Sequence, residues 1–174
     1  CGSGIFSLAA RRLGAEVYSF DYDGDSVACT AALRDREGSD GDWLVERGSV
    51  LDAGYLASLH RFDFVYAWGV LHHTGDLWRA MENAVSTVAS GGKLVVAIYN
   101  DQGWISRYWL AVKRLYNSNP LARTAVVLVH LPYLFVARAL VRAARGQFAL
   151  ERGMSLWHDM IDWLGGYPFE VATP

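Results

Sequence analysis

The hydrophobic pattern of the first hundred residues changes period several times. Runs that alternate polar and apolar residues, or that are continuously apolar and rich in β-branched and aromatic side chains, favour strands. The strands predicted in this way lie at 15–21, 43–47, 62–68 and 93–99. Between them, apolar positions three and four residues apart favour helices at 5–13, 26–34 and 76–89. Strands that alternate with helices form βαβ units, so the pattern predicts a parallel sheet.

Local signals indicate where two of the predicted helices begin and end. Asp25 or Ser26 is expected to cap the helix over 26–34. The helix over 76–89 is expected to close at Gly91-Gly92, because glycine readily adopts the left-handed conformation that often ends a helix.

After Asn100 the pattern becomes helical. It predicts an amphipathic helix over 104–116 and a last helix over 153–164, with a strongly apolar segment between them at 121–144. His130 and Pro132 interrupt that apolar segment. A strand-like segment at 167–171 follows the last helix.

Composition bounds the class of protein. The chain has 174 residues, of which 52% are hydrophobic, enough for a substantial core in a domain of ordinary size. Its two cysteines, Cys1 and Cys29, form neither a disulfide framework nor a cluster with metal-ligand spacing, so we expect no metal. No secretory signal is visible, and a cytoplasmic location is expected.

The charge is distributed unevenly. The net charge is −2, yet residues 102–150 contain no Asp or Glu. The basic residues in that stretch are Arg107, Lys113, Arg114, Arg123, Arg138, Arg142 and Arg145. A basic and aromatic segment within an otherwise acidic chain suggests a separate task for that segment.

A glycine turn at the start of the chain carries the first chemical signal. Cys1-Gly2-Ser3-Gly4 leads directly into the first predicted helix, an arrangement that brings backbone N–H groups and a helix N-terminus to a polar ligand. Asp21 ends the next predicted strand, where a carboxylate accepts hydrogen bonds from a ribose diol. Together the turn and the acid predict a site for a nucleoside-containing cofactor.

Two further segments resemble a known family. Residues 62–73 read FDFVYAWGVLHH, and a predicted helix then leads to the segment GGKLVV at 91–96. With the glycine turn and the acidic strand end, this order resembles the class I S-adenosylmethionine-dependent methyltransferases over roughly residues 1–100. It resembles most the small-molecule branch, which includes enzymes that methylate quinone precursors.

The resemblance implies a cofactor and a set of residues that bind it. S-adenosylmethionine is the implied cofactor, with the glycine turn at its methionine end, Asp21 on the ribose hydroxyls and Tyr22 beside the adenine. Ser49 and Val50 are implied at the adenine edge, and Trp68 near the sulfonium. The residues implied in cofactor binding are Cys1, Gly2, Ser3, Gly4, Asp21, Tyr22, Ser49, Val50 and Trp68. Ser49 stands where the family often has an acid.

The implied fold is α/β, a Rossmann-like, doubly wound and mostly parallel sheet with a helical cap inserted after the fifth strand. Residues 1–100 are expected to form the cofactor-binding core, 101–165 a basic and aromatic substrate cap, and 166–174 the start of a following strand. The chain begins without an initiator Met and without the strand that should precede the glycine turn. We therefore interpret it as a fragment lacking the first strand, which by itself should bind cofactor poorly.

Two alternative functions remain open. Gly2-x-Gly4-x-x-Ser7 differs from an NAD-type dinucleotide fingerprint only at its last position, although dehydrogenases need neither the VLHH segment nor the Gly91-Gly92 turn. The chain is alternatively a catalytically inactive, cofactor-binding regulatory domain at a membrane surface.

His72 and His158 are the candidate catalytic bases, because histidine exchanges protons near neutral pH. The pair His72-His73 is interpreted first as a framework element that caps the end of the strand, and catalysis is the second interpretation. His158 and Asp162 are four residues apart, a spacing that can orient the imidazole.

The helical cap is expected to select the acceptor. Its aromatic residues Trp104, Tyr108, Trp109 and Tyr116 suggest a pocket for a small-molecule or lipid-like acceptor. The segment 121–146 is short and interrupted for a membrane-spanning helix, and it suggests either a buried lid or a peripheral membrane contact. No specific nucleic-acid motif is present.

Overall fold

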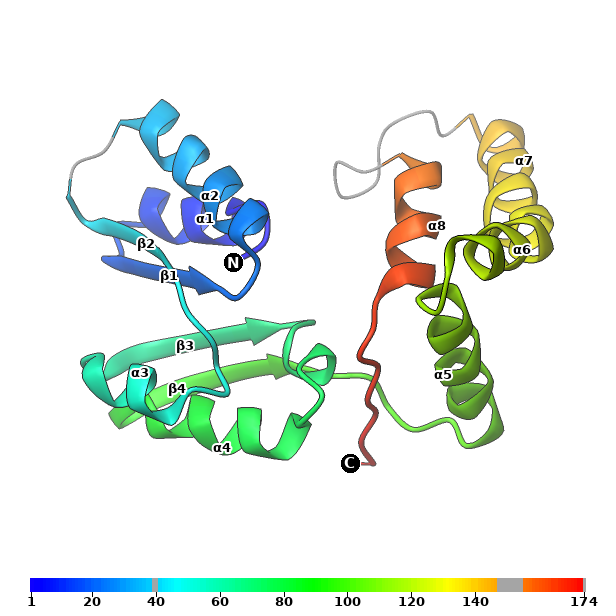
Figure 1. Cartoon of the computed structure of the whole chain (residues 1–174). Helices are drawn as coiled ribbons and strands as arrows, with labels where there is room; N and C mark the ends of the chain where they lie inside the picture. Colours follow the sequence, from blue (N-terminus) through cyan, green and yellow to red (C-terminus); the bar gives the residue numbers. More distant parts are fainter. Residues whose placement is uncertain (39–40, 147–154, 174) are drawn as a thin grey trace. The chain divides into compact units, whose positions relative to one another are not determined.

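A computed structural model describes residues 1–38, 41–146 and 155–173 (Figure 1). Its strands are β1 Val17–Asp21, β2 Trp43–Arg47, β3 Phe62–Trp68 and β4 Val88–Ala97. Its helices are α1 Ile5–Arg12, α2 Gly24–Glu37, α3 Ala53–Ser58, α4 Leu77–Ser86, α5 Trp104–Tyr116, α6 Pro120–Leu131, α7 Arg138–Ala144 and α8 Leu156–Gly165. The predicted alternation of strands and helices through β4, followed by a mainly helical segment, is confirmed.

The chain forms two compact units. Residues 1–66 and 78–95 make up the first unit, and residues 67–77 and 96–174 make up the second. The first unit holds the glycine turn and most of the four strands, and the second holds α5 to α8. The boundaries at residues 100 and 165 stay a prediction.

The strands of the first unit pair in parallel, in two ladders. β1 pairs with β2 from Val17 opposite Trp43 to Asp21 opposite Arg47. β3 pairs with β4 in a second ladder, and no ladder joins the two pairs among the described residues. Parallel ladders whose strands are connected through helices are typical of doubly wound α/β folds.

Two predicted helix ends are wrong, the start of α2 and the end of α4. The cap of α2 is Asp23, not Asp25 or Ser26, because the Asp23 carboxylate accepts the backbone N–H of Ser26 at 2.9 Å. Helix α4 ends at Ser86, before the Gly91-Gly92 pair.

That glycine pair lies inside β4 instead of closing α4. Gly91 has φ +81°, which only glycine adopts without strain. A Cβ on Gly92 would lie 2.9 Å from the Asp63 carbonyl oxygen and 3.0 Å from that of Phe62. The pair therefore lets β4 approach the backbone of β3 closely.

The second unit is a helical cluster with its own core. Helix α6 packs against α5, and α8 contacts α5 (Figure 1). Buried apolar side chains from all three helices, and from the π-helical turn Pro132–Ala137, meet in this core. They are Val112, Tyr116, Val126, Leu134, Met160 and Leu164.

Two features of the second unit differ from the sequence analysis. The apolar segment is not broken at Pro132, because the π-helical turn Pro132–Ala137 accommodates the missing N–H and joins α6 to α7. The strand expected at 167–171 is reduced to one parallel bridge, in which the Ala172 N–H donates to the Tyr99 carbonyl at 2.9 Å. The first two residues of the helix expected over 153–164 lie outside the described residues.

The close approach at Gly92 yields a stability prediction. Gly92→Ala is expected to lower the free energy of unfolding by about 1–3 kcal/mol, because the new Cβ overlaps carbonyl oxygens that are fixed in a ladder. Gly24→Ala is the matched control, since Gly24 has nothing within 4 Å of its Cβ position, and it should stay within about 0.5 kcal/mol. Urea unfolding followed by circular dichroism measures both, and equal values for the two variants would contradict the assignment.

Candidate functional site

The glycine turn is held in place by α2. Gly4 has φ +77°, a backbone conformation that strains any residue with a side chain. A Cβ at this position would also lie only 3.0 Å from Thr30 Oγ1, so both backbone and space require glycine. The Thr30 hydroxyl donates to the Gly2 carbonyl at 2.9 Å. Gly2 has φ +55° and open space where a Cβ would stand. The turn is therefore fixed from behind by Thr30 and open in front at Gly2.

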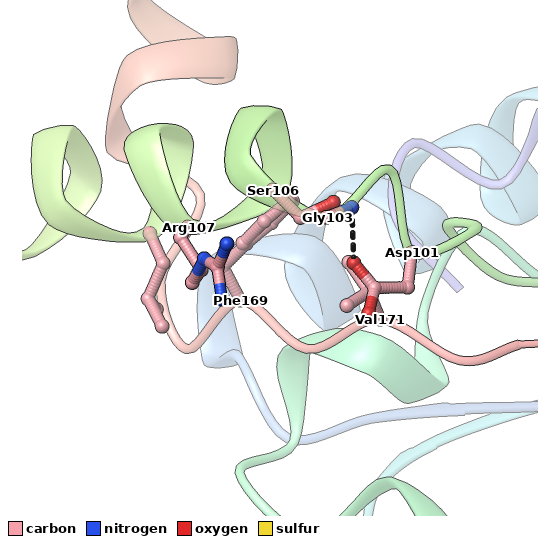
Figure 2. Close-up of a pocket in the computed structure, with 7 residues that line it drawn as sticks. Asp101, Gly103, Ser106, Arg107, Phe169 and Val171 are labelled. Carbon is pink, nitrogen blue, oxygen red and sulfur yellow. Dashed lines mark hydrogen bonds between the residues drawn. The ribbon is translucent and has the colours of Figure 1, made fainter.

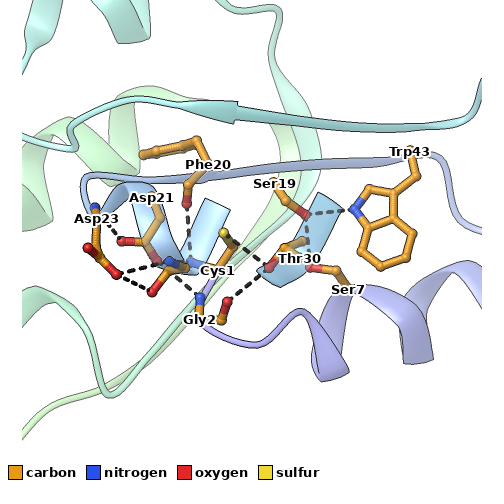
Figure 3. Close-up of polar contacts among 10 residues, drawn as sticks. Cys1, Gly2, Ser7, Ser19, Phe20, Asp21, Asp23, Thr30 and Trp43 are labelled. Atoms are coloured by element: carbon orange, nitrogen blue, oxygen red, sulfur yellow. Dashed lines mark hydrogen bonds and ion pairs between the residues drawn. The ribbon is translucent and has the colours of Figure 1, made fainter. Parts of the chain in front are cut away.

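Asp21 binds the front of this turn (Figure 3). Its Oδ2 lies 2.5 Å from the Cys1 nitrogen and accepts the Gly2 N–H at 3.0 Å. Its Oδ1 accepts the Asp23 N–H at 3.1 Å. The structure thus brings together the turn and the acidic strand end that the sequence analysis singled out separately.

The pKa of Asp21 follows from these contacts. Partial burial raises the pKa of Asp21, whereas the hydrogen bonds from the backbone N–H groups of Gly2 and Asp23 lower it by stabilising the ionised carboxylate. The group is therefore an ionised hydrogen-bond acceptor at neutral pH. That is the state that receives the hydroxyls of a sugar.

Beneath the turn, a polar contact joins α1 to both strands of the first ladder. Trp43 Nε1–H donates to Ser19 Oγ at 3.0 Å, and Ser7 Oγ lies 2.8 Å from the same oxygen. Ser19 and Trp43 are buried. The sequence analysis did not single out Thr30, Ser19 and Trp43. A hydroxyl or an indole N–H inside an apolar element was the available signal, and it does not by itself indicate which group it will contact.

The residues implied at the adenine lie in the same unit. Tyr22 is 73% exposed, and its ring lies beside the Arg47 guanidinium at 5.6 Å. Ser49 Oγ accepts the Leu51 N–H at 3.2 Å, and the Val50 carbonyl accepts from Asn83 at 2.8 Å. These contacts fix the backbone at Ser49 and Val50 and leave the Tyr22 ring open to a ligand.

The remaining members of the set lie apart from these contacts. Ser3 is exposed on the turn. Trp68 is half exposed at the end of β3, in the second unit.

The residues present suit a nucleoside-containing cofactor. Three of the roughly four acceptor positions of a carboxylate are used at Asp21, and one remains on Oδ1. An open glycine backbone and an exposed aromatic ring stand in the same unit. Charge, space and stacking surface are therefore all available.

His72 is a buried residue of the second unit. It is 1% exposed, and neither ring nitrogen has a hydrogen-bond partner in the structure. Its ring stacks 4.0 Å from Tyr99 and 4.3 Å from His73. Burial, with the charges of His73 and Lys113, lowers the pKa of His72 to about 4. These contacts favour the framework interpretation over catalysis.

The same unit contains a buried lysine whose burial the sequence analysis did not predict. Lys113 is 1% exposed, donates to the Trp163 carbonyl and lies 4.3 Å from the Trp163 ring and 5.1 Å from that of Phe169. Burial lowers the pKa of Lys113 to about 8, although the Asp162 charge opposes the shift. The neighbouring His73 donates from Nδ1 to the Pro168 carbonyl at 2.6 Å. This cluster attaches α5 to α8 and to the chain beyond it.

His158 lies on the first turn of α8 and is exposed. Its Nδ1 is 2.7 Å from the hydroxyl of Ser155, which caps the helix through the His158 N–H. The expected partner, Asp162, is replaced in this contact by Ser155. The neighbouring Asp159 pairs with Arg138 at 2.5 Å.

A shallow pocket lies at the start of α5 (Figure 2). Its volume is about 140 Å³, and it is lined by Asp101, Gly103, Ser106, Arg107, Leu110, Phe169 and Val171. Ligand sites for whole small molecules measure roughly 300–1,000 Å³, so this pocket has room for one chemical group and not for an entire acceptor. Among residues 1–38, 41–146 and 155–173, no group of three His, Cys, Asp or Glu is arranged for a metal.

The parallel ladders, with the glycine turn held against Asp21, define an α/β protein with a Rossmann-like fold. Residues 1–147 match the family described as methyltransferase domain. The chain belongs to this family, which confirms the resemblance to the class I S-adenosylmethionine-dependent methyltransferases. A comparison with curated proteins gives no match.

Solved structures share the fold. YcgJ of Bacillus subtilis aligns with a TM-score of 0.57 at 14% identity, over 74% of this chain and 57% of that one. A provisionally assigned methyltransferase of Bacillus halodurans gives 0.53 at 14% identity, over 72% and 58%. A structure from work on converting a disulfide bond into a thioacetal group in echinomycin biosynthesis gives 0.50 at 23% identity, over 66% and 48%. The chain spans about half to three fifths of these proteins.

The burial of His72 predicts a dependence of stability on acid. Its folded pKa of about 4 lies below the ordinary 6.5, so the unfolded chain binds a proton that the folded chain does not. Stability is expected to fall by up to about 3 kcal/mol as pH drops from 6.5 to 4. His72→Phe, which keeps the stacking, should flatten this loss in urea unfolding series, and His60→Phe should not. An unchanged pH slope in His72→Phe would contradict the prediction.

Proposed function

We propose that the chain is an S-adenosylmethionine-dependent methyltransferase that acts on a small-molecule or lipid-like acceptor. Methyl transfer in general follows from the family. The choice of cofactor rests on one observation, the ionised Asp21 carboxylate bound to the N–H of Gly2 at the open front of the glycine turn. A sugar and a charged ligand tail fit side by side at such a place.

Each residue of the proposed site has a separate task. Asp21 accepts a ribose hydroxyl at the acceptor position that remains on Oδ1, and the open backbone at Gly2 allows the methionine end to approach. Tyr22 offers its exposed ring to the adenine. Ser49 and Val50 flank the adenine edge with a backbone that is already fixed. We propose that Cys1, Ser3 and Gly4 complete the turn.

The bound cofactor would supply a methyl group activated on a positively charged sulfur. The chain has to hold the acceptor in line with that methyl group and exclude water, since position supplies most of the rate in such a displacement. An acceptor of high pKa also needs a base. We propose His158 for this task, because it is exposed and its Nδ1 is already oriented by Ser155.

The acceptor class is supported by the exposed part of the helical cap. Of the four aromatic residues expected to line a pocket, Tyr116 lies in the core and Trp109 packs edge-on to Trp163 at 5.3 Å. Trp104 and Tyr108 are exposed and remain candidates. Two aromatic surfaces favour an acceptor with a planar or apolar part.

The two alternatives differ in what they predict. An NAD-type site is disfavoured by the family match. A catalytically inactive regulatory domain binds the same cofactor as an enzyme, so binding and turnover have to be measured separately.

The cofactor assignment is tested by Asp21→Asn. The variant should bind S-adenosylmethionine at least tenfold more weakly in isothermal titration, because it loses the charge that strengthens hydrogen bonds from the ribose. Asp25→Asn makes the same chemical change on exposed α2 and should bind like the unaltered protein. The comparison should include a longer version that restores the strand expected before Cys1. Equal affinities of Asp21→Asn and Asp25→Asn would remove the assignment.

The proposed base is tested by His158→Gln. Transfer of a labelled methyl group to small molecules of a cell extract should fall at least tenfold, with unchanged cofactor affinity, because glutamine cannot take up a proton. His60→Gln, in the first unit, is the control and should keep full turnover. Turnover that His158→Gln leaves unchanged would exclude this base, and cofactor binding without any turnover would favour the regulatory alternative.

A further inference from the structure

The helix from Pro120 to Ala144 presents an exposed apolar face. Its 25 residues are long and apolar enough to cross a membrane by length and composition, yet only 17% of its most apolar 18-residue window is buried. Large apolar side chains on the exposed side recur at helical spacing along the whole length. They are Leu121, Leu128, Val129, Tyr133, Val136 and Leu140, and we call them the outer face.

The opposite side of the same helix is committed to the protein. Val126 and Leu134 are buried in the core with α5 and α8. Between them, the buried His130 binds Tyr108 through Nε2 at 2.8 Å. The helix is therefore anchored along one side, and the outer face points away from that anchor. On a water-soluble surface, exposed apolar residues are usually scattered singly and not aligned over 20 residues.

Charge decides what kind of partner suits the outer face. The stretch 102–150 has seven basic residues and no acidic one. Arg145 is exposed at one end of the helix, Arg123 is exposed near the other with its guanidinium over the Tyr116 ring at 5.2 Å, and Arg138 pairs with Asp159 of α8. Two copies meeting through this face would bring like charges together, whereas an anionic lipid surface combines apolar depth with opposite charge.

We propose that the outer face docks the chain onto an anionic membrane surface, with the helix lying in the plane of the interface. Its leucine and valine side chains enter the acyl boundary, and arginines at the helix ends reach anionic headgroups. The inference does not rest on the proposed methyl transfer, because docking needs neither cofactor nor acceptor.

The packing of the helix argues for an interfacial position and not a spanning one. Its partners α5 and α8 have 13 and 10 residues, well short of the roughly 20 that a spanning helix needs. Crossing the bilayer would carry the buried Lys113 and its contacts with α8 into the hydrocarbon or detach them. A helix that lies in the interface keeps these contacts, because only its outer face enters the lipid and the rest of the unit stays in water.

The test is sedimentation with vesicles of phosphatidylcholine alone or mixed with phosphatidylglycerol. The protein should bind the mixed vesicles, with added salt weakening the binding, and should bind neutral vesicles at least tenfold more weakly. Leu128→Gln with Leu140→Gln should lower the partition coefficient at least tenfold. The matched control removes two exposed leucines elsewhere, Leu44→Gln with Leu115→Gln, and should bind like the unaltered protein.

Arg123→Gln with Arg145→Gln tests the charge separately and should weaken binding to mixed vesicles severalfold while circular dichroism stays unchanged. Three results would overturn the proposal. They are equal binding to neutral and mixed vesicles, equal binding by the two leucine pairs, and resistance of the bound protein to alkaline carbonate extraction, which indicates a spanning helix. A dimer in solution that only the outer-face leucine pair dissolves would assign the face to a second copy instead.

Discussion

The first unit depends on the carboxylate of Asp21, which ties the end of β1 to the glycine turn. It receives hydrogen bonds from the backbone N–H groups of Gly2 and Asp23, so a single acid holds the glycine turn and the chain that follows β1. These donors stabilise the ionised carboxylate against partial burial. The group that shapes the turn is therefore also the group whose charge we propose for binding the ribose.

Contacts from α1 and α2 hold the glycine turn close to β1. Gly4 leaves no room for a side chain next to Thr30, and the Thr30 hydroxyl in turn holds the Gly2 carbonyl. Ser19 takes a hydrogen bond from the buried Trp43 indole and contacts a serine of α1. Buried donors with partners cost little, whereas unpaired ones are expensive. These hydrogen bonds hold the turn from the side of α1 and α2, whereas the space next to Gly2 stays open.

Most elements of the fold could be predicted from the sequence, because period and turn residues are local signals. The bounds of β2, β3 and α5 agree with the sequence analysis to the residue. The errors lie where a distant backbone decides: Gly92 looks like a helix end but makes room for β3, and Pro132 looks like a break but fits a π-helical turn. In the site, Asp21 was predictable from its place at a strand end. Thr30 was not, since only the folded chain brings α2 to the turn.

The buried lysine of the second unit shows the same limit of sequence reasoning, whereas the buried histidine does not. The His-His pair after a strand is interpreted from the sequence mainly as a framework element, and His72 lies against the rings of Tyr99 and His73, where burial lowers its pKa. Lys113 counts as one of seven positive charges in residues 102–150 of the sequence, but it lies against the aromatic rings of Trp163 and Phe169. The positive charge that remains outside belongs to arginines, which remain charged at any physiological pH. An apolar helix with such permanent charges near its ends is suited to an anionic surface. The buried His72 and Lys113 have a different role, because they stabilise the helical unit to which this helix belongs.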